Sequence, residues 1–260
     1  MSAPPSFDTP WSSNGKIATV TGDSRGIGQA ISVHLARKGL TKLAITYASN
    51  IEAEELGVGQ AIAIKADALD PKFGPKTVAE VVKRLDTTTI DILVNNAVLA
   101  DLSRALPIKD TTLDVFLEIM QANVYAPVSV TTALLPQSSQ LWRPTFQDNS
   151  DPTVAYGASK IAPQSYTRAF AENFSKSKKA TFNSVIVGLT AIDSIKASQH
   201  MMPPGFLDGQ IRDTTAGERI GVPDDIAYIV GFLTSEECHW VNGGAVSANG
   251  GTKLVMSALG

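Results

Sequence analysis

Two patterns of apolar residues alternate along this chain. Short apolar and β-branched runs predict buried strands, and stretches in which apolar residues recur every three or four positions predict amphipathic helices. The expected strands are 16–21, 42–47, 61–66, 90–94, 182–187 and 245–248, and the expected helices are 26–38, 75–85, 113–135, 156–175 and 224–233. Strands that alternate with helices are typical of a parallel sheet covered on both faces. We therefore expect a doubly wound α/β fold.

Two segments fit this pattern less well. A strand is hard to find in 137–155, where the best candidate, 141–146, contains Pro144. Proline removes an N–H group from a sheet ladder and is a poor central-strand residue. The connection 48–60 has room for only a stub of helix. Both features are consistent with a remodelled wall around a site or with an error in the gene model.

The chain lacks repeats, low-complexity tracts and linkers that would divide it. Residues 15–260 are therefore expected to form a single domain, preceded by an extended arm at 1–14 that contains three prolines. The N-terminus has neither a cationic start nor an apolar run, and no stretch reaches the ~18 apolar residues of a membrane helix. A cytoplasmic protein is the expectation.

Composition narrows the classes of partner. Of the 260 residues, 43% are hydrophobic, which is enough for a sizeable core, and the net charge is −3. A mildly acidic chain argues against nucleic acid or a membrane surface as partner, because both attract positive charge. The single cysteine and the scattered histidines at 34, 200 and 239 give no metal-ligand spacing, so no metal site is expected.

A glycine-rich loop follows the first expected strand. Residues 21–28 read Thr-Gly-Asp-Ser-Arg-Gly-Ile-Gly, and a helix begins at once. Glycines allow the backbone to approach a pyrophosphate, and the helix N-terminus offers free N–H groups and partial positive charge. A tight turn with a purely structural use is the alternative. The position in the first βαβ unit favours dinucleotide binding.

The end of the second strand bears on the choice of cofactor. An NAD-selective site usually places an acid there, but this chain has Tyr47, Ser49 and Asn50, with no acid before Glu52. Arg25 in the glycine loop offers a cation that suits a 2′-phosphate. An ordinary surface arginine is the alternative. We expect NADPH rather than NADH.

These features, with others further along, resemble the short-chain dehydrogenase/reductase family. The resemblance spans about 15–253, implies a Rossmann-like oxidoreductase fold, and rests on an ordered set of motifs: the loop at 21–28, Asp67-Ala68, Asn95-Asn96-Ala97, Asn123, the Tyr-Gly-Ala-Ser-Lys motif at 156–160, the segment 221–227, and Asn-Gly-Gly at 249–251.

The resemblance implies a catalytic group of Tyr156, Lys160 and Asn123. Tyr156 would be the general acid, although a free tyrosine with a pKa near ~10 is a weak one. Lys160 lies one helical turn away on the same face, so its charge would lower that pKa. Asn123 would anchor a water that links Lys160 to solvent. An ordinary surface pair on a helix is the alternative for Tyr156 and Lys160.

The resemblance also implies the cofactor contacts. Asp67 and Ala68 would touch the adenine, Asn95 would tie the fourth strand to its neighbours, and Ala97 and Val98 would lie along the ribose. Backbone groups near Thr190 would face the carboxamide. The full expected set is Gly22, Ser24, Arg25, Gly26, Ile27, Gly28, Tyr47, Ser49, Asn50, Asp67, Ala68, Asn95, Ala97, Val98, Tyr156, Lys160, Gly188 and Thr190.

One family feature is missing. The family places a serine that binds the substrate oxygen about 13 residues before the tyrosine, but Arg143 occupies that position. None of Ser138, Ser139 and Ser150 has the spacing. Three hypotheses follow. The chain is an NADPH-dependent reductase of an apolar ketone of secondary metabolism or of a keto-acyl group. Alternatively, it is an altered member that binds the cofactor but acts on imines, in cyclisation or as a binding module. A purely structural subunit is disfavoured by the intact Tyr156 and Lys160.

Two further expectations concern partners. In the family, the segment corresponding to 193–221 closes over the substrate, and Met201, Met202 and Phe206 suit a bulky apolar molecule. This segment could instead simply cover the core. Related proteins pair subunits through the helices expected at 113–135 and 156–175, so we expect a homodimer or homotetramer, with Tyr166, Phe170 and Phe174 either on that face or in the core.

Overall fold

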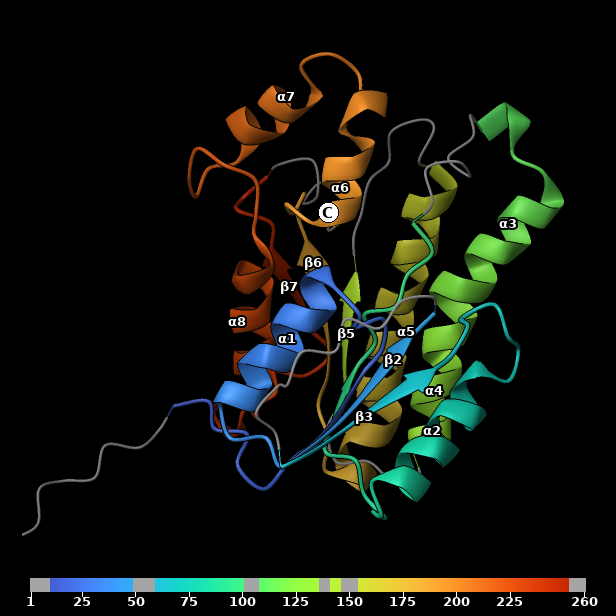
Figure 1. The fold of residues 1–260 in the computed structure, drawn as a ribbon, viewed down its shortest axis with the longest axis vertical. Helices are drawn as coiled ribbons and strands as arrows, with labels where there is room; N and C mark the ends of the chain where they lie inside the picture. The colour runs from blue at the N-terminus through green and yellow to red at the C-terminus, as the bar shows by residue number, and fades with distance from the viewer. Residues whose placement is uncertain (1–9, 49–58, 101–107, 136–140, 146–153, 253–260) are drawn as a thin grey trace, which may run out of the picture.

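A computed structural model describes residues 10–48, 59–100, 108–135, 141–145 and 154–252 (Figure 1). One sheet of seven strands has the order β3-β2-β1-β4-β5-β6-β7, and every neighbouring pair is parallel. This confirms the doubly wound, Rossmann-like α/β fold. The strands are β1 (Ile17–Val20), β2 (Lys42–Tyr47), β3 (Gln60–Lys65), β4 (Ile92–Val94), β5 (Leu141–Thr145), β6 (Phe182–Val187) and β7 (Ala245–Ala248).

Helices cover both faces of the sheet (Figure 1). On one face, α1 (Gly26–Arg37) and α8 (Pro223–Leu233) bury Ile31, Leu35 and Val230 against β1, β2 and β6. On the other face, α2 (Phe73–Arg84), α4 (Ala126–Leu134) and α5 (Val154–Lys178) form the second core cluster. Strands covered on both faces are apolar throughout, which explains the continuous apolar runs.

The fifth strand exists despite Pro144, which corrects the expectation that this segment makes a poor strand. β4 pairs with β5 only through Leu93 with Leu141 and Val94 with Trp142. Pro144 lies beyond the end of β4 and is in register only with Val185 of β6. A proline at this position therefore disturbs pairing on one side of the strand at most.

The long helix expected at 113–135 is divided. Its parts are α3 (Leu113–Met120), a π-helical turn η3 (Gln121–Tyr125) and α4. In η3 the Ala126 N–H donates to the Gln121 carbonyl, five residues back. Proline at 127 has no N–H to give to the carbonyl four residues earlier, and its ring crowds that carbonyl. A widened turn accommodates both effects.

The segment expected as a substrate-covering loop at 193–221 contains short helices. They are α6 (Asp193–Ser198), η4 (Gln199–Met201) and α7 (Phe206–Asp213), and none has a buried residue. They lie beyond the carboxyl ends of the strands (Figure 1). The segment is fastened at Thr190 and Gly221, which form an isolated bridge, and at Gly250, whose carbonyl accepts from Thr215 N–H. Helices this short show too little periodicity for the sequence to predict them.

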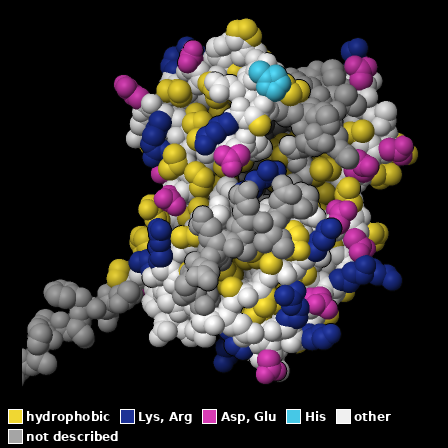
Figure 2. Space-filling model, viewed as in Figure 1, with side chains coloured by type: hydrophobic (Ala, Val, Ile, Leu, Met, Phe, Trp, Pro, Cys, Tyr) yellow, Lys and Arg dark blue, Asp and Glu magenta, His cyan; other side chains and the backbone are white. Residues whose placement is uncertain are grey.

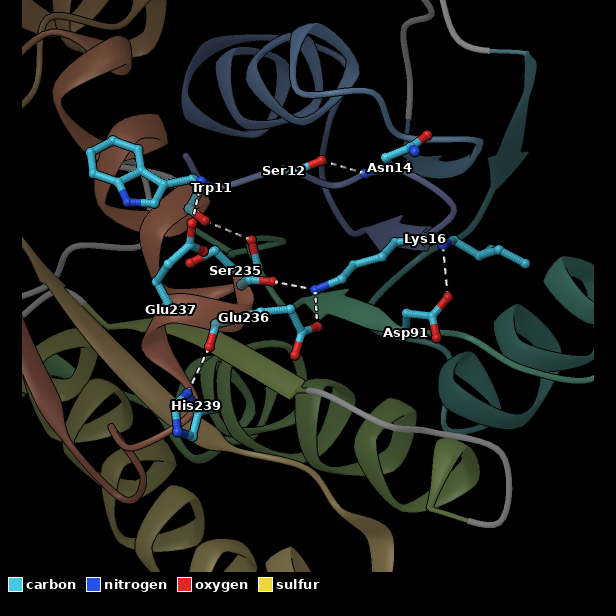
Figure 3. A network of polar contacts seen from close by, with 12 residues as sticks. Trp11, Ser12, Asn14, Lys16, Asp91, Ser235, Glu236, Glu237 and His239 are labelled. Atoms are coloured by element: carbon cyan, nitrogen blue, oxygen red, sulfur yellow. Dashed lines mark hydrogen bonds and ion pairs between the residues drawn. The ribbon is translucent and has the colours of Figure 1, made fainter. Parts of the chain in front are cut away.

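The first described residues dock on the end of α8 (Figure 3). The Trp11 N–H donates to the Glu237 carboxylate at 3.0 Å, and the Trp11 ring packs edge-on against Phe232. Lys16 Nζ donates to the Thr234 carbonyl at 3.0 Å and pairs with Glu236 of η5 (Glu236–Cys238). The rest of the expected arm, 1–9, lies outside the described residues. Within the described chain, no helix is both long and apolar enough to cross a membrane.

Candidate active site

The order of the strands indicates where a ligand would bind at the carboxyl edge of the sheet. The chain builds outward from β1 to β2 and β3 in one direction, and from β4 to β7 in the other. Ligands of open α/β sheets bind where this reversal leaves a gap, here between β1 and β4. The glycine loop leaves β1 at this point, and residues 95–98 leave β4 beside it.

The glycine loop is pressed closely against the segment after β4. A Cβ atom on Gly22, whose φ is +68°, would lie 2.6 Å from the Ala97 Cα atom. A Cβ on Gly28 would lie 2.7 Å from both Asn96 Nδ2 and the Gly22 carbonyl oxygen. Larger residues would push the loop outward, so the glycines create a cradle of main chain at the N-terminus of α1.

Asn96 holds this loop in place, a role that sequence reasoning did not assign. Its Nδ2 donates to the carbonyls of Thr21 at 3.1 Å and Gly22 at 2.8 Å. The Thr21 hydroxyl in turn accepts the N–H groups of Asn96 and Ala97. Asn95 points elsewhere and donates to the Thr131 hydroxyl of α4 at 3.2 Å. The sequence shows the two adjacent asparagines, but which of them contacts the glycine loop depends on the direction of each side chain.

Arg25 is the exposed cation of the loop. It precedes the first residue of α1, and that helix has no acidic residue in its first turn. Within the described part of the chain, its side chain makes no hydrogen bond or ion pair. Ser24 and Ile27 are half-buried, as is Tyr47 at the end of β2. Ser49 and Asn50, expected beside it, lie outside the described residues.

The expected adenine and ribose contacts lie along the same edge of the sheet. Asp67 follows β3 and is exposed, and one of its oxygens accepts from Leu69 N–H at 2.9 Å. Ala68 is half-buried and packs on the second core cluster. Val98 follows Ala97 in the chain and is 43% exposed, although the family's usual residue there is smaller.

Asp23 is an acid buried within the glycine loop, which sequence reasoning passed over. Its side chain is 3% exposed, and Ser32 of α1 donates to one carboxyl oxygen at 2.6 Å. Burial raises the pKa of this carboxyl to about 7, against the lowering effect of the Ser32 hydroxyl. The Asp23 and Gly22 N–H groups are held by Thr46 of β2, which fixes the loop on its other side.

Tyr156 and Lys160 meet on the first turns of α5. The Lys160 ammonium lies 5.4 Å from the centroid of the Tyr156 ring, and Lys160 is only 7% exposed. Their i, i+4 spacing brings them to one helix face. A buried ammonium beside a phenol is an arrangement that favours proton transfer from the hydroxyl group.

Asn123 lies in η3, next to α5. Its Oδ1 accepts the Leu99 N–H at 2.8 Å, and its Nδ2 donates to the Leu99 carbonyl and to the Ser159 hydroxyl, both at 3.2 Å. Its side chain is therefore used to hold neighbouring segments together. Its own carbonyl lacks the usual i+4 donor because residue 127 is proline.

The segment after β6 is held against the segment after β7 and lies beside the glycine loop. Gly188 N–H donates to the Ala248 carbonyl at 3.2 Å, and a Cβ on Gly188 would lie 2.8 Å from the Asn249 Cα atom. Thr190 is buried, and its hydroxyl donates to the Gly188 carbonyl at 2.9 Å. Ile192 lies against Gly26 of the glycine loop.

The backbone of β5 can be compared with the position expected from the sequence for the family's serine. Arg143 is the middle residue of β5, in register with Ser184. Thr145 ends that strand, in register with Ile186, at the carboxyl edge of the sheet. Ser138, Ser139 and Ser150 lie outside the described residues.

Comparison with known proteins agrees with this geometry. The family model described as enoyl-(acyl carrier protein) reductase matches residues 22–253. The short chain dehydrogenase asqE of Emericella nidulans is 46% identical, with 96% of this chain and 98% of the relative covered. Versicolorin reductase 1 of Aspergillus parasiticus is 32% identical, with coverage of 92% and 96%.

Solved structures share the fold. A short-chain dehydrogenase from Burkholderia cenocepacia, solved in complex with NADP, superposes with a TM-score of 0.77 at 29% identity, covering 92% of this chain and 98% of that one. A short-chain dehydrogenase/reductase from Serratia marcescens gives a TM-score of 0.79 at 25% identity, with the same coverage. With this sheet order, this site and these relatives, the chain belongs to the short-chain dehydrogenase/reductase family of oxidoreductases.

Proposed function

We propose that this protein is an NADPH-dependent carbonyl reductase in which Tyr156 donates the proton. The observation that carries the proposal is the position of Tyr156 beside the buried ammonium of Lys160, on the helix that adjoins Asn123. A purely structural helix would gain nothing from burying an ammonium group there, because burial of a charge is costly.

The proposed cofactor fits the residues at the carboxyl edge of the sheet. The main-chain cradle at Gly22 and Gly28, at the start of α1, suits a pyrophosphate. The exposed Arg25 guanidinium, with no acid at the end of β2, suits a 2′-phosphate rather than a free ribose hydroxyl. The NADP complex of the Burkholderia relative supports this choice.

The residues divide the reaction between them. When bound, NADPH supplies the hydride that reduces the carbonyl carbon. Tyr156 gives its hydroxyl proton to the carbonyl oxygen, and the Lys160 ammonium stabilises the phenolate that remains. Asn123 keeps the two neighbouring segments together. To restore the phenol, Lys160 passes a proton to the Tyr156 phenolate, and we propose that a water bound at the Asn123 carbonyl returns a proton from solvent to Lys160.

Thr145 is our proposed replacement for the family's serine. It is the one hydroxyl-bearing residue of β5, and its backbone lies at the carboxyl end of that strand. Hydroxyl-bearing residues can bind a substrate oxygen as its charge develops, so this residue type at this strand end fits the role. Thr145→Val should then lower kcat by roughly 10-fold or more while Thr145→Ser retains activity; equal activity of the two variants would contradict this assignment.

An apolar substrate suits the segment that lies beyond the carboxyl edge of the sheet. Met201 of η4 and Val222 at the start of α8 are exposed, and Figure 2 shows apolar side chains at the surface over α6 and α7. We propose a bulky apolar ketone of secondary metabolism or a keto-acyl group, which agrees with the versicolorin reductase among the relatives. The presence of Arg143 in place of the serine favours the second candidate, a member that binds NADPH but has lost ketone reduction.

A second copy of the chain is the proposed partner. Leu113, Phe116 and Leu117 of α3 and Ile161 and Tyr166 of α5 are exposed large apolar side chains. Figure 2 shows apolar side chains on the side where α3 lies. Exposed apolar patches of this kind commonly mark subunit contacts. Light scattering that gives a monomer mass would contradict this proposal.

One experiment separates the two functions. NADPH and NADH are titrated into the protein, and absorbance is then followed with a panel of apolar ketones and imines. Ketone-dependent oxidation of NADPH supports the reductase, and Tyr156→Phe should then reduce kcat by roughly 10²- to 10⁴-fold without weakening NADPH. Turnover that survives this substitution contradicts the role of Tyr156. Tight binding without ketone reduction supports the altered member.

A further inference from the structure

Ser159 lies at the centre of a chain of hydrogen bonds next to the reacting groups. The side chain is fully buried, with an exposed fraction of 0%. Its hydroxyl donates to the Tyr156 carbonyl at 2.7 Å and accepts from Asn123 Nδ2 at 3.2 Å. A serine hydroxyl has one proton to give and lone pairs to accept with, so both capacities are used here.

The chain of bonds continues to the side on which the cofactor is proposed to bind. Asn123 holds both main-chain groups of Leu99, which follows directly on the cofactor-facing residues after β4. The connected path therefore runs from Leu99 through the Asn123 amide and the Ser159 hydroxyl to the Tyr156 carbonyl. It joins three segments distant in sequence: the loop after β4, the turn η3 and the first turn of α5.

The ordinary helical ladder cannot set this spacing by itself. In η3 the hydrogen bonds are widened to i, i+5, and proline at 127 removes one donor. The relative position of η3 and α5 therefore depends on side-chain contacts. One such contact is the hydrogen bond from Asn123 to Ser159, and Ser159 lies within one helical turn of Tyr156.

We propose that Ser159 is a positioning residue for catalysis: its hydroxyl ties the first turn of α5 to Asn123 and so fixes the Tyr156 phenol relative to the loop after β4 and the bound cofactor. This inference rests on the proposed role of Tyr156 as proton donor. Without this bond, the first turn of α5 could shift away from the loop after β4, so the phenol would lie farther from the positive charge of bound NADP⁺, which favours the phenolate.

The structure offers a matched control. Ser129 in α4 is also buried, and its hydroxyl donates to the Ala126 carbonyl at 2.7 Å, the same i−3 contact that Ser159 makes with Tyr156. Serine hydroxyls within helices often make this local bond. Within the described residues, Ser129 has no counterpart to the Asn123 contact. Both Ser159→Ala and Ser129→Ala lose the hydrogen bond to a carbonyl within the same helix, but only Ser159→Ala also loses the bond to Asn123. Comparing the two variants therefore isolates the effect of the Asn123 bond.

The test measures kcat, KM and NADPH affinity for both variants across a range of pH, with a ketone that the wild type reduces. The ionisation of the Tyr156 phenol is also followed by near-ultraviolet absorbance in the NADP⁺ complex, after subtraction of the Tyr156→Phe spectrum. Alanine is smaller than serine and favours helices, so folding should persist, and unchanged NADPH affinity verifies it.

We expect Ser159→Ala to lower kcat by about 3- to 10-fold, the effect of one lost hydrogen bond. The pH–rate profile and the midpoint of phenol ionisation should both move to higher pH, and Ser129→Ala should leave both in place. Equal behaviour of the two variants, or a lower kcat without any shift along the pH axis, would overturn the inference. If Tyr156→Phe keeps its turnover, the proposed function fails separately; the phenol midpoint still decides whether Ser159 positions Tyr156.

Discussion

Replacing Asp23 by asparagine should change how the stability of this protein depends on pH. Burial raises the pKa of the Asp23 carboxyl from its ordinary value of 3.8 to about 7. Such a rise corresponds to about 4 kcal/mol of unfavourable free energy once the group is ionised in both states. The folded state binds the proton more tightly than the unfolded chain does. Its stability is therefore unaffected below about pH 4, falls as pH rises, and levels off above about pH 7.

The amide introduced by Asp23→Asn would not titrate, and its carbonyl could still accept from the Ser32 hydroxyl. We therefore compare the free energy of unfolding of Asp23→Asn with that of the wild type at each pH. The difference in favour of the variant should grow by up to about 4 kcal/mol between pH 4 and pH 8. Urea unfolding of both proteins at a series of pH values measures this, because the other titrating groups cancel in the difference. Ser32→Ala removes the donor that lowers the pKa, so its stability should go on falling to a higher pH than that of the wild type. Parallel curves for wild type and Asp23→Asn would refute the reasoning.

Three other substitutions follow from the same structure. Arg25→Ala should weaken the binding of NADPH by roughly 10- to 100-fold, because a charge-assisted contact is lost, and should weaken the binding of NADH much less. Equal losses of affinity for the two cofactors in fluorescence titrations would contradict 2′-phosphate binding. Gly22→Ala should weaken both cofactors at least about 10-fold, because its Cβ would meet the Ala97 backbone at a positive φ, and unchanged affinity would show that the loop can shift. The pKa of His34 is lowered mainly by burial, and its Nε2 has no hydrogen-bond partner among the described residues. Because the folded state binds this proton less tightly than the unfolded chain does, stability should be lost as pH falls below about 6.5. His34→Gln should flatten that acid-side loss in thermal unfolding, and an unchanged slope would assign it to other groups.

The sequence alone determined the elements whose signals are local. The apolar runs located β2, β6 and β7 at their observed bounds, and the helical spacing located α1, α2 and α8 to within two residues at each end. The glycine loop and the pair Tyr156 and Lys160 were equally readable, because each lies within one turn or one helix. Local spacing suffices there, since the backbone geometry of a turn or helix fixes which neighbours meet.

The tertiary structure alone decided the features that depend on distant segments. Asn96 reaches the Gly22 carbonyl across 74 positions in sequence, and only the pairing of β1 with β4 brings them together. The burial of Asp23, and the joining of Leu99, Asn123 and Ser159, likewise arise from sheet order and helix packing. β5 tolerates Pro144 because β4 ends before it. Periodicity records which face of an element is apolar, whereas these contacts depend on which element covers that face and in what register.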